Sequence, residues 1–225
     1  MAKLTQTLAT WYEHRVLPLG LDFVCGLGRF SQQREQVVPK ARGRVLEIGI
    51  GTGLNLPHYA REQVDSITGI DPATELHPWA ARRARDAGLQ VELVPLQAEA
   101  LPFAEHSFDT VLVTYALCTI ADPVAALHEM RRVLKPEGQL IYCEHGLAPE
   151  DAVQRWQRRI GPIWCRCAGG CQLDRDIPAL IQSAGFELLE PQAGYIAGPR
   201  PFTYNYWGQA RALTALAPSS GPCHG

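Results

Sequence analysis

A chain of 225 residues, of which 46% are hydrophobic, is long enough to bury a full core in one domain. The formal net charge of −2 excludes a strongly basic surface and gives no reason to expect nucleic acid as a partner. The sequence shows neither the roughly 20 apolar residues of a membrane-spanning helix nor the pattern of a secretory signal. With seven cysteines interpreted as reduced thiols, we expect a cytoplasmic protein without an integral membrane segment.

The first 40 residues are expected to form a helical lid that precedes the first strand. Segments 4–15 and 21–36 look helical, and residues 39–43 link them to the sheet. The lid belongs to one domain that is expected to extend from residue 1 to residue 217. A tail rich in proline, serine and glycine then follows over 218–225 and is expected to be disordered.

Residues 45–55 read VLEIGIGTGLN, an apolar run that breaks into glycines at alternate positions. A buried parallel strand ends in this way when the chain turns tightly over a cofactor. Glycine suits such a turn because a Cβ would obstruct the backbone angles and the close approach of a ligand. Dinucleotide-binding loops place a third small residue where this chain has Leu54, whereas here the third glycine is Gly53. The alternative is a glycine-rich turn that holds no ligand.

A carboxylate follows the second expected strand, over residues 66–70. Asp71 comes about 20 residues after the glycine loop, where a ribose-binding carboxylate belongs. An ionised Asp only accepts hydrogen bonds, so it can take both hydroxyl protons of a ribose diol. Asp71 and Pro72 also look like the start of a helix, and both interpretations can hold together. Two acidic strand ends, Glu47 and Asp71, favour the interpretation that the glycine loop binds a ligand.

Strands and helices alternate along the rest of the chain, which is typical of an α/β sheet. We expect helices over 53–60, 73–87, 124–134 and 175–184, strands over 90–94, 107–113, 139–143 and 186–189, and a final antiparallel strand over 203–212. The KPEG segment at 135–138 is expected to end the third of these helices by proline and glycine chemistry.

The pattern E-x-G-x-G-x-G from Glu47 to Gly53 resembles the first motif of the class I S-adenosylmethionine-dependent methyltransferases. AEALPF at 98–103 resembles the adenine-side motif of that family, and SFD at 107–109 and RRVLKPEG at 131–138 resemble its motifs around the fourth and fifth strands. The resemblance extends from about residue 44 to about residue 212. It implies an α/β fold with a Rossmann-like, seven-stranded, mostly parallel sheet, and S-adenosyl-L-methionine as the cofactor.

The same resemblance implies a set of cofactor-holding residues at the strand ends. These are Glu47, Gly49, Gly51, Thr52, Gly53, Asn55, Asp71, Pro72, Gln97, Ala98, Glu99, Thr114 and Tyr115. Gln97 departs from the family, whose members usually carry an Asp there that accepts from the adenine amino group. A Gln amide oxygen can accept the same hydrogen bond without a charge.

A narrower resemblance lies in the second half of the chain. YALCTI at 115–120, Glu144–His145, Trp164 and GGCQLDR at 169–175 are similar to the methyltransferase-like proteins of the alkyl-thiol S-methyltransferase group. Animal members of that group carry an N-terminal hydrophobic anchor. We expect no such anchor in this sequence, so the resemblance does not imply membrane attachment here. The residues expected to bind the substrate are Cys118, His145, Trp164, Cys171 and Arg175. The segment between strand five and Arg175 is expected to be a substrate-specific insertion.

His145 is expected at the end of strand five, on the edge where open α/β sheets bind ligands. It is either a catalytic group that accepts a proton from the acceptor or a structural histidine bonded to a carbonyl. Cys165, Cys167 and Cys171 have a spacing that suits a soft metal or arsenite. Because zinc sites usually need four ligands, we expect these three cysteines to be reduced and metal-free.

The expected activity is transfer of a methyl group from S-adenosylmethionine to a small thiol or hydrosulfide by in-line displacement. Three alternatives remain open: methylation of oxygen, nitrogen or carbon in a metabolite, quinone or lipid; methylation of arsenite; and a non-catalytic protein that binds the cofactor. The sequence does not determine the oligomeric state.

Overall fold

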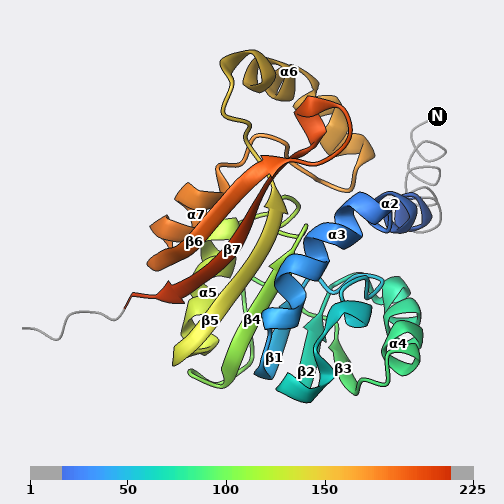
Figure 1. The fold of residues 1–225 in the computed structure, drawn as a ribbon, viewed down its shortest axis with the longest axis vertical. Helices are drawn as coiled ribbons and strands as arrows, with labels where there is room; N and C mark the ends of the chain where they lie inside the picture. The colour runs from blue at the N-terminus through green and yellow to red at the C-terminus, as the bar shows by residue number, and fades with distance from the viewer. Residues whose placement is uncertain (1–16, 214–225) are drawn as a thin grey trace, which may run out of the picture.

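A computed structural model describes residues 17–213 and contains one seven-stranded sheet with the strand order β3-β2-β1-β4-β5-β7-β6 (Figure 1). The strands are β1 (Gly43–Ile48), β2 (Val64–Ile70), β3 (Val91–Val94), β4 (Phe108–Thr114), β5 (Leu134–His145), β6 (Phe186–Tyr195) and β7 (Tyr204–Ala212). The first five strands pair in parallel, and β7 pairs antiparallel to both β5 and β6. The expected Rossmann-like, mostly parallel sheet is therefore confirmed.

Helices cover both faces of this sheet. The α-helices of the described residues are α2 (Leu17–Cys25), α3 (Gly28–Val37), α4 (His77–Asp86), α5 (Pro123–Val133), α6 (Asp151–Cys167) and α7 (Ile177–Ser183). The alternation of side chains along each strand separates two cores: Leu46 and Ile48 pack with α5 and α7, and Val45 packs with α3 and α4. α2 and α6 lie at the carboxyl ends of the parallel strands (Figure 1), the edge at which open α/β sheets generally bind ligands.

Local chemistry explains why the chain forms these helices. The Asp122 side chain accepts a hydrogen bond from the Ala125 amide at 2.9 Å and caps α5, while Pro123 occupies the first turn. Leu127 and Met130 are both fully buried on the inner face of α5, as their helical spacing predicts. Asp176 caps α7 in the same way, which moves its start from the expected residue 175 to Ile177.

Two predicted helices are wrong in part. The helix expected over 21–36 is divided at Gly26, where a Cβ would lie 2.7 Å from the Asp22 carbonyl oxygen. The helix expected over 53–60 is reduced to a single 3₁₀ turn, Leu56–His58. Pro57 lacks an amide donor, and Asn55 uses its side chain inside the protein, so a regular helix does not continue.

β5 begins five residues earlier than predicted. Phe108 pairs with Leu134 but Thr110 pairs with Gln139, so the KPEG segment is accommodated as an irregularity inside the ladder rather than as a separate turn. The predicted helix over 4–15 and the predicted tail over 218–225 lie outside the described residues. Within 17–213, none of the helices has the length and apolar character needed to cross a membrane.

Candidate active site

The glycine loop after β1 leaves space beside Asp71. Gly49, Gly51 and Gly53 have φ angles of 66°, 52° and 82°, in the left-handed region that favours glycine. A Cβ on Gly49 would lie 2.6 Å from the Ala116 Cβ, and one on Gly53 would lie 2.8 Å from a Leu56 methyl carbon. A Cβ on Gly51 would meet nothing closer than an Asp71 oxygen at 3.9 Å. Two glycines therefore permit close packing, and the middle one keeps open a space that a ligand can use.

Asp71 is held in place by the main chain around it. One carboxylate oxygen accepts from the Gly51 amide at 3.0 Å, and the other accepts from the Ala73 amide at 2.8 Å. Burial raises the pKa of Asp71, and these two hydrogen bonds oppose that shift. Since an ionised carboxylate can accept about four hydrogen bonds, capacity remains for a ligand diol.

Glu47 lies beneath the loop instead of facing the space above it. Its side chain is buried, and its two oxygens accept hydrogen bonds from Asn55 Nδ2 at 2.9 Å and from the Tyr59 hydroxyl at 2.7 Å. Burial raises the pKa of Glu47 to about 7. Both oxygens thus contact Asn55 and Tyr59 and position these two side chains. Direct contact of Glu47 with the cofactor stays a prediction.

Asn55 connects the loop to β4 and to the N-terminal helices. Its Nδ2 donates to Thr114 Oγ1 at 2.9 Å, and its Oδ1 accepts from Arg34 Nε at 3.0 Å. The Arg34 guanidinium also lies over the Tyr115 ring, 5.2 Å from its centroid. Asn55 and Thr114 are both buried, so they brace the loop from below, and Arg34 is a site residue that the sequence analysis missed.

A second group fastens α2 to the glycine loop. Asp22 forms a two-pronged ion pair with Arg83 of α4, with a closest approach of 2.8 Å, and accepts from the Thr52 hydroxyl at 2.6 Å. Arg83 also donates to the Thr52 carbonyl oxygen at 2.7 Å. Burial raises the pKa of Asp22, but the bonds from Arg83 and Thr52 outweigh it and lower that pKa. A single Asp inside the apolar segment 16–27 was the available signal for this contact.

The other expected cofactor residues follow β2 and β3 at the same edge of the sheet. Pro72 and Gln97 are exposed, and Ala98 is buried. Glu99 accepts a long hydrogen bond of 3.4 Å from the Asp122 amide. These residues share with Gly51 and Asp71 the edge of the sheet at the carboxyl ends of the parallel strands.

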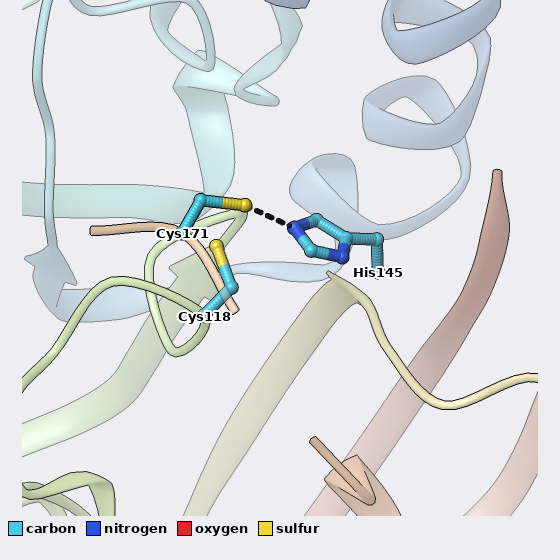
Figure 2. Close-up of side chains that lie close together, drawn as sticks. All are labelled: Cys118, His145 and Cys171. Carbon is cyan, nitrogen blue, oxygen red and sulfur yellow. Dashed lines mark hydrogen bonds between the residues drawn. The ribbon is translucent and has the colours of Figure 1, made fainter. Parts of the chain in front are cut away.

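Three side chains distant in sequence meet beyond β4 and β5, as Figure 2 shows. The sulfur atoms of Cys118 and Cys171 and a ring nitrogen of His145 all lie within 4.8 Å of one another. His145 Nε2 lies 3.0 Å from Cys171 Sγ, and Trp164 Nε1 donates to the same sulfur at 3.1 Å. We call Cys118, His145 and Cys171 the sulfur cluster.

Main-chain contacts hold the sulfur cluster together. Cys118 follows β4, His145 ends β5, and Cys171 follows α6. The Gln172 amide donates to the Cys118 carbonyl oxygen at 2.9 Å, which ties the insertion to the end of β4. Arg175, which is expected to bind the substrate, is buried and donates to the Leu117 carbonyl oxygen. Its guanidinium therefore serves to join these two loops.

The charges in the sulfur cluster depend on one another. The Cys118 thiol is the main cause that lowers the pKa of Cys171 to about 4, burial opposes it, and His145 lowers it further. Burial lowers the pKa of His145, but the contact with Cys171 outweighs this effect and raises it. The hydrogen bond to Cys171 raises the pKa of Cys118 well above its ordinary value.

The cysteine grouping expected from sequence is corrected. Cys165 and Cys167 lie in the last turn of α6, and neither belongs to the sulfur cluster. Cys171 instead meets a cysteine 53 positions earlier, Cys118, and a histidine 26 positions earlier, His145. Short-range spacing therefore grouped the wrong residues, because the relevant distances are set by neighbouring strand ends.

Comparison with known proteins agrees with this architecture. Residues 46–142 match the model of the family described as Methyltransferase domain. The thiol S-methyltransferase TMT1B of Rattus norvegicus is 32% identical over 165 residues, which cover 72% of this chain and 67% of that protein. The demethylmenaquinone methyltransferase of Thermus thermophilus is 36% identical over 141 residues, 62% of each chain. An S-adenosylmethionine-dependent methyltransferase of Methanosarcina mazei has the same fold, with a TM-score of 0.60, 24% identity, and coverage of 78% of this chain and 95% of that one.

The chain belongs to the class I S-adenosylmethionine-dependent methyltransferases, and S-adenosylmethionine is its cofactor. Within that class its sequence is similar both to thiol S-methyltransferases and to quinone methyltransferases. It is also 26% identical to the mitochondrial methyltransferase OMS1 of Saccharomyces cerevisiae, over 74% of this chain but only 39% of the yeast protein.

Proposed function

We propose that this methyltransferase transfers a methyl group to a small thiol or to hydrosulfide. The observation that carries the proposal is the sulfur cluster at the carboxyl ends of β4 and β5. Cys118 is two residues from Ala116 in the sequence. The Ala116 Cβ lies against Gly49 of the glycine loop, where a Cβ on Gly49 would clash with it. This short separation of Cys118 from Ala116 along the chain supports an acceptor site beside the proposed cofactor space. The similarity to rat thiol S-methyltransferase TMT1B supports the same choice.

The cofactor would be bound at the glycine loop and at the ends of β2 and β3. We propose that the open space at Gly51 and the remaining acceptor capacity of Asp71 receive the ribose, with Gln97, Ala98 and Glu99 on the adenine side. Glu47, Asn55 and Thr114 position the loop from beneath. When bound, S-adenosylmethionine supplies a methyl group that is already activated by the positive charge on its sulfur.

The protein itself then has to orient the acceptor and exclude water. Orientation of reacting groups supplies up to about 7–11 kcal/mol of a barrier. For a thiol acceptor the thiolate is the nucleophile, so the site must also favour loss of the thiol proton. We propose that His145 is the catalytic residue on the acceptor side, with Cys118, Cys171 and Trp164 around the acceptor and Arg175 as a positioning residue.

A second candidate acceptor is a quinol or another small hydroxyl, amine or carbon acid. The 36% identity to the Thermus thermophilus demethylmenaquinone methyltransferase supports this alternative. Arsenite is a third candidate acceptor, because a pair of cysteines such as Cys118 and Cys171 suits soft ligands. A non-catalytic cofactor-binding protein is the fourth alternative.

An acceptor panel separates these functions. S-adenosylhomocysteine release is measured with hydrosulfide, simple alkyl thiols, catechols, amines, quinol analogues and arsenite side by side. We expect turnover with hydrosulfide and alkyl thiols. Turnover of a hydroxyl or amine acceptor while thiols stay inert contradicts the thiol assignment and leaves the methyltransferase class standing.

We also propose that residues 1–40 act as a lid on a single domain that extends to residue 217. The contacts of Asp22 with Thr52 and of Arg34 with Asn55 support this role for the helices within 17–40. A cytoplasmic location is proposed because Cys118, Cys143 and Cys171 are free thiols, which a reducing compartment preserves. Cell fractionation of the tagged protein tests the location.

A further inference from the structure

We propose that the sulfur cluster is a zinc site with three protein ligands, Cys118, His145 and Cys171, and a fourth position that takes the sulfur of the acceptor. This inference rests on the proposed function, because it assigns the means by which the thiol acceptor is bound and deprotonated.

The spacing of the three ligand atoms fits a single ion. Tetrahedral zinc, with Zn–S of about 2.3 Å and Zn–N of about 2.0–2.1 Å, holds two sulfur ligands roughly 3.8 Å apart and a sulfur and a nitrogen roughly 3.6 Å apart. The two sulfurs and the His145 nitrogen lie within 4.8 Å of one another, and the Nε2–Sγ distance to Cys171 is 3.0 Å. Side-chain shifts of roughly 1 Å bring all three atoms onto one ion. In Figure 2 the Cys171 sulfur is directed at the imidazole of His145, and the Cys118 sulfur lies beside it.

Charge and burial favour a metal at this place. Cys118 and Cys171 are 3% and 8% exposed, so both can become thiolates only beside a compensating cation. Zn²⁺ with two thiolates and a neutral imidazole has no net charge. The Trp164 N–H directed at Cys171 Sγ is the kind of outer hydrogen bond that orients a metal ligand. The Gln172 amide and the Arg175 guanidinium fix the loops that carry both cysteines.

The number of ligands decides which type of zinc site this is. Structural zinc sites are closed by four protein ligands, whereas catalytic sites have three and leave one position for water or substrate. Within residues 17–213, the group able to hold a metal has three members. Trp164 and Phe202, whose ring centroids are 4.6 Å apart, pack against the cluster and present an apolar surface to an alkyl thiol.

The chemical step balances as follows. The acceptor R–SH replaces water on zinc, a Zn–S bond forms, and the thiol proton leaves to solvent. A lone pair on that sulfur then forms the new S–CH₃ bond, while the bond from the methyl carbon to the sulfonium breaks and its electron pair stays on S-adenosylhomocysteine. The product R–S–CH₃ is an uncharged thioether, a weaker ligand than a thiolate, so water replaces it.

The test measures metal before it measures activity. The full-length protein, purified without chelators, is analysed for zinc by elemental analysis, and zinc affinity is determined by competition with a chromophoric chelator. Substitution by Co²⁺ then gives an optical spectrum that reports thiolate-to-metal charge transfer and tetrahedral geometry. The variants are Cys118→Ser, Cys171→Ser and His145→Ala, with Cys165→Ser as the matched control because Cys165 lies in the same insertion but outside the cluster.

We expect about one zinc per chain, a tetrahedral cobalt spectrum that changes when an alkyl thiol is added, and a loss of zinc affinity of about 100-fold or more in each ligand variant. The Cys165→Ser variant should keep wild-type affinity. Folding of each variant is checked by circular dichroism and by S-adenosylmethionine binding.

Wild-type protein that binds neither zinc nor cobalt after full reduction overturns the inference, as does affinity that persists in the folded Cys118→Ser and Cys171→Ser variants. A Cys118–Cys171 disulfide that forms in air and leaves a metal-free dithiol on reduction also overturns it. If the metal-free protein methylates thiols at full rate, the zinc site fails while the proposed function stands. If zinc binds but only hydroxyl or amine acceptors react, the proposed function fails and the metal site stands without its thiol role.

Discussion

At the scale of single residues, the site separates groups that face the ligand space from groups that brace it. Asp71 and Gly51 border the open space, while Glu47 and Asn55 complete their hydrogen bonds beneath the loop. The two acidic strand ends therefore have different surroundings: Asp71 accepts from main-chain amides beside the open space, and Glu47 accepts from the Asn55 and Tyr59 side chains.

Replacing Asp71 by Ala should weaken S-adenosylmethionine binding by about 10- to 100-fold, because a hydrogen bond to a charged group contributes about 1.5–3 kcal/mol. Isothermal titration calorimetry measures the change, and NAD should not bind either form. The control is Asp65→Ala, an exposed carboxylate at the start of the same strand. Unchanged affinity in the Asp71 variant would remove this residue from the cofactor site.

Glu47 should make the protein less stable as pH rises. Its pKa is about 7 in the folded state against an ordinary 4.5, so its contribution is fully present below about pH 4.5 and is lost as pH rises through about 7. One pKa unit is about 1.4 kcal/mol, so this carboxyl accounts for up to about 3 kcal/mol of that loss. Glu144, whose burial also raises its pKa to about 7, adds to it in the same direction.

Urea unfolding between about pH 5 and pH 8 measures the Glu47 effect. In Glu47→Gln the free energy of unfolding should fall less as pH rises, by the amount that Glu47 contributes, because an amide does not titrate. The neutral amide can still form hydrogen bonds with Tyr59 and Asn55. The exposed Glu92→Gln variant is the control. An identical pH dependence in wild type and Glu47→Gln would show that Glu47 is ionised without penalty.

His145→Ala should lower kcat with thiol acceptors by about 10²- to 10⁴-fold while changing cofactor affinity little, since its proposed role belongs to the acceptor. The loss should be smallest for the most acidic thiols, which are already ionised. Initial rates over a series of thiols of increasing acidity provide the measurement. A variant that loses cofactor affinity but keeps its kcat would assign His145 to the cofactor instead.

At the scale of elements, residues of the candidate site come from α2 and from the insertion that carries α6 as well as from the ends of the parallel strands. α2 is joined to the glycine loop through Asp22, Thr52 and Arg83, and the insertion supplies Cys171 and Trp164. The boundaries of the buried strands followed from apolar runs. The break at Gly26 and the early start of β5 did not, because they depend on which neighbour each segment meets.

Arg83→Ala should destabilise the protein by about 1–3 kcal/mol and weaken cofactor binding through Thr52, because it removes a partly buried charge pair and leaves Asp22 without its partner. Arg82→Ala is the matched control, since Arg82 forms only an exposed pair with Asp86 on the same helix. Chemical unfolding and calorimetry measure the two effects. Equal losses of stability and cofactor affinity in both variants would show that the contact between α2 and the glycine loop contributes no more than an exposed ion pair.

At the scale of the whole molecule, the glycine loop, β2, β4 and the N-terminal helices all meet at one edge, so a ligand there should stabilise the entire fold. At a concentration of 100 Kd, a ligand that binds only the native state contributes about 2.7 kcal/mol. For a chain of this size that corresponds to a rise in Tm of roughly 5–11 °C.

Differential scanning calorimetry with S-adenosylmethionine, S-adenosylhomocysteine and NAD measures this rise. The first two ligands should raise Tm and NAD should leave it unchanged. Asp71→Ala should shift the response to higher ligand concentration without removing it. A rise confined to a separate transition would mean that the bound edge unfolds independently of the rest of the chain.

The sequence by itself determined the class of fold and the identity of the cofactor. Buried strands leave apolar runs, a loop with positive φ requires glycines, and the carboxylate of Asp71 must follow a strand; each of these signals is local in the chain. Only the tertiary structure decided that Glu47 lies beneath the loop, that Arg34 and Asp22 reach it from the N-terminal helices, and that Cys171 meets Cys118 and His145 instead of Cys165 and Cys167. Such contacts depend on which strand ends become neighbours in the sheet, and that order is fixed by packing of the whole molecule and not by spacing along the chain.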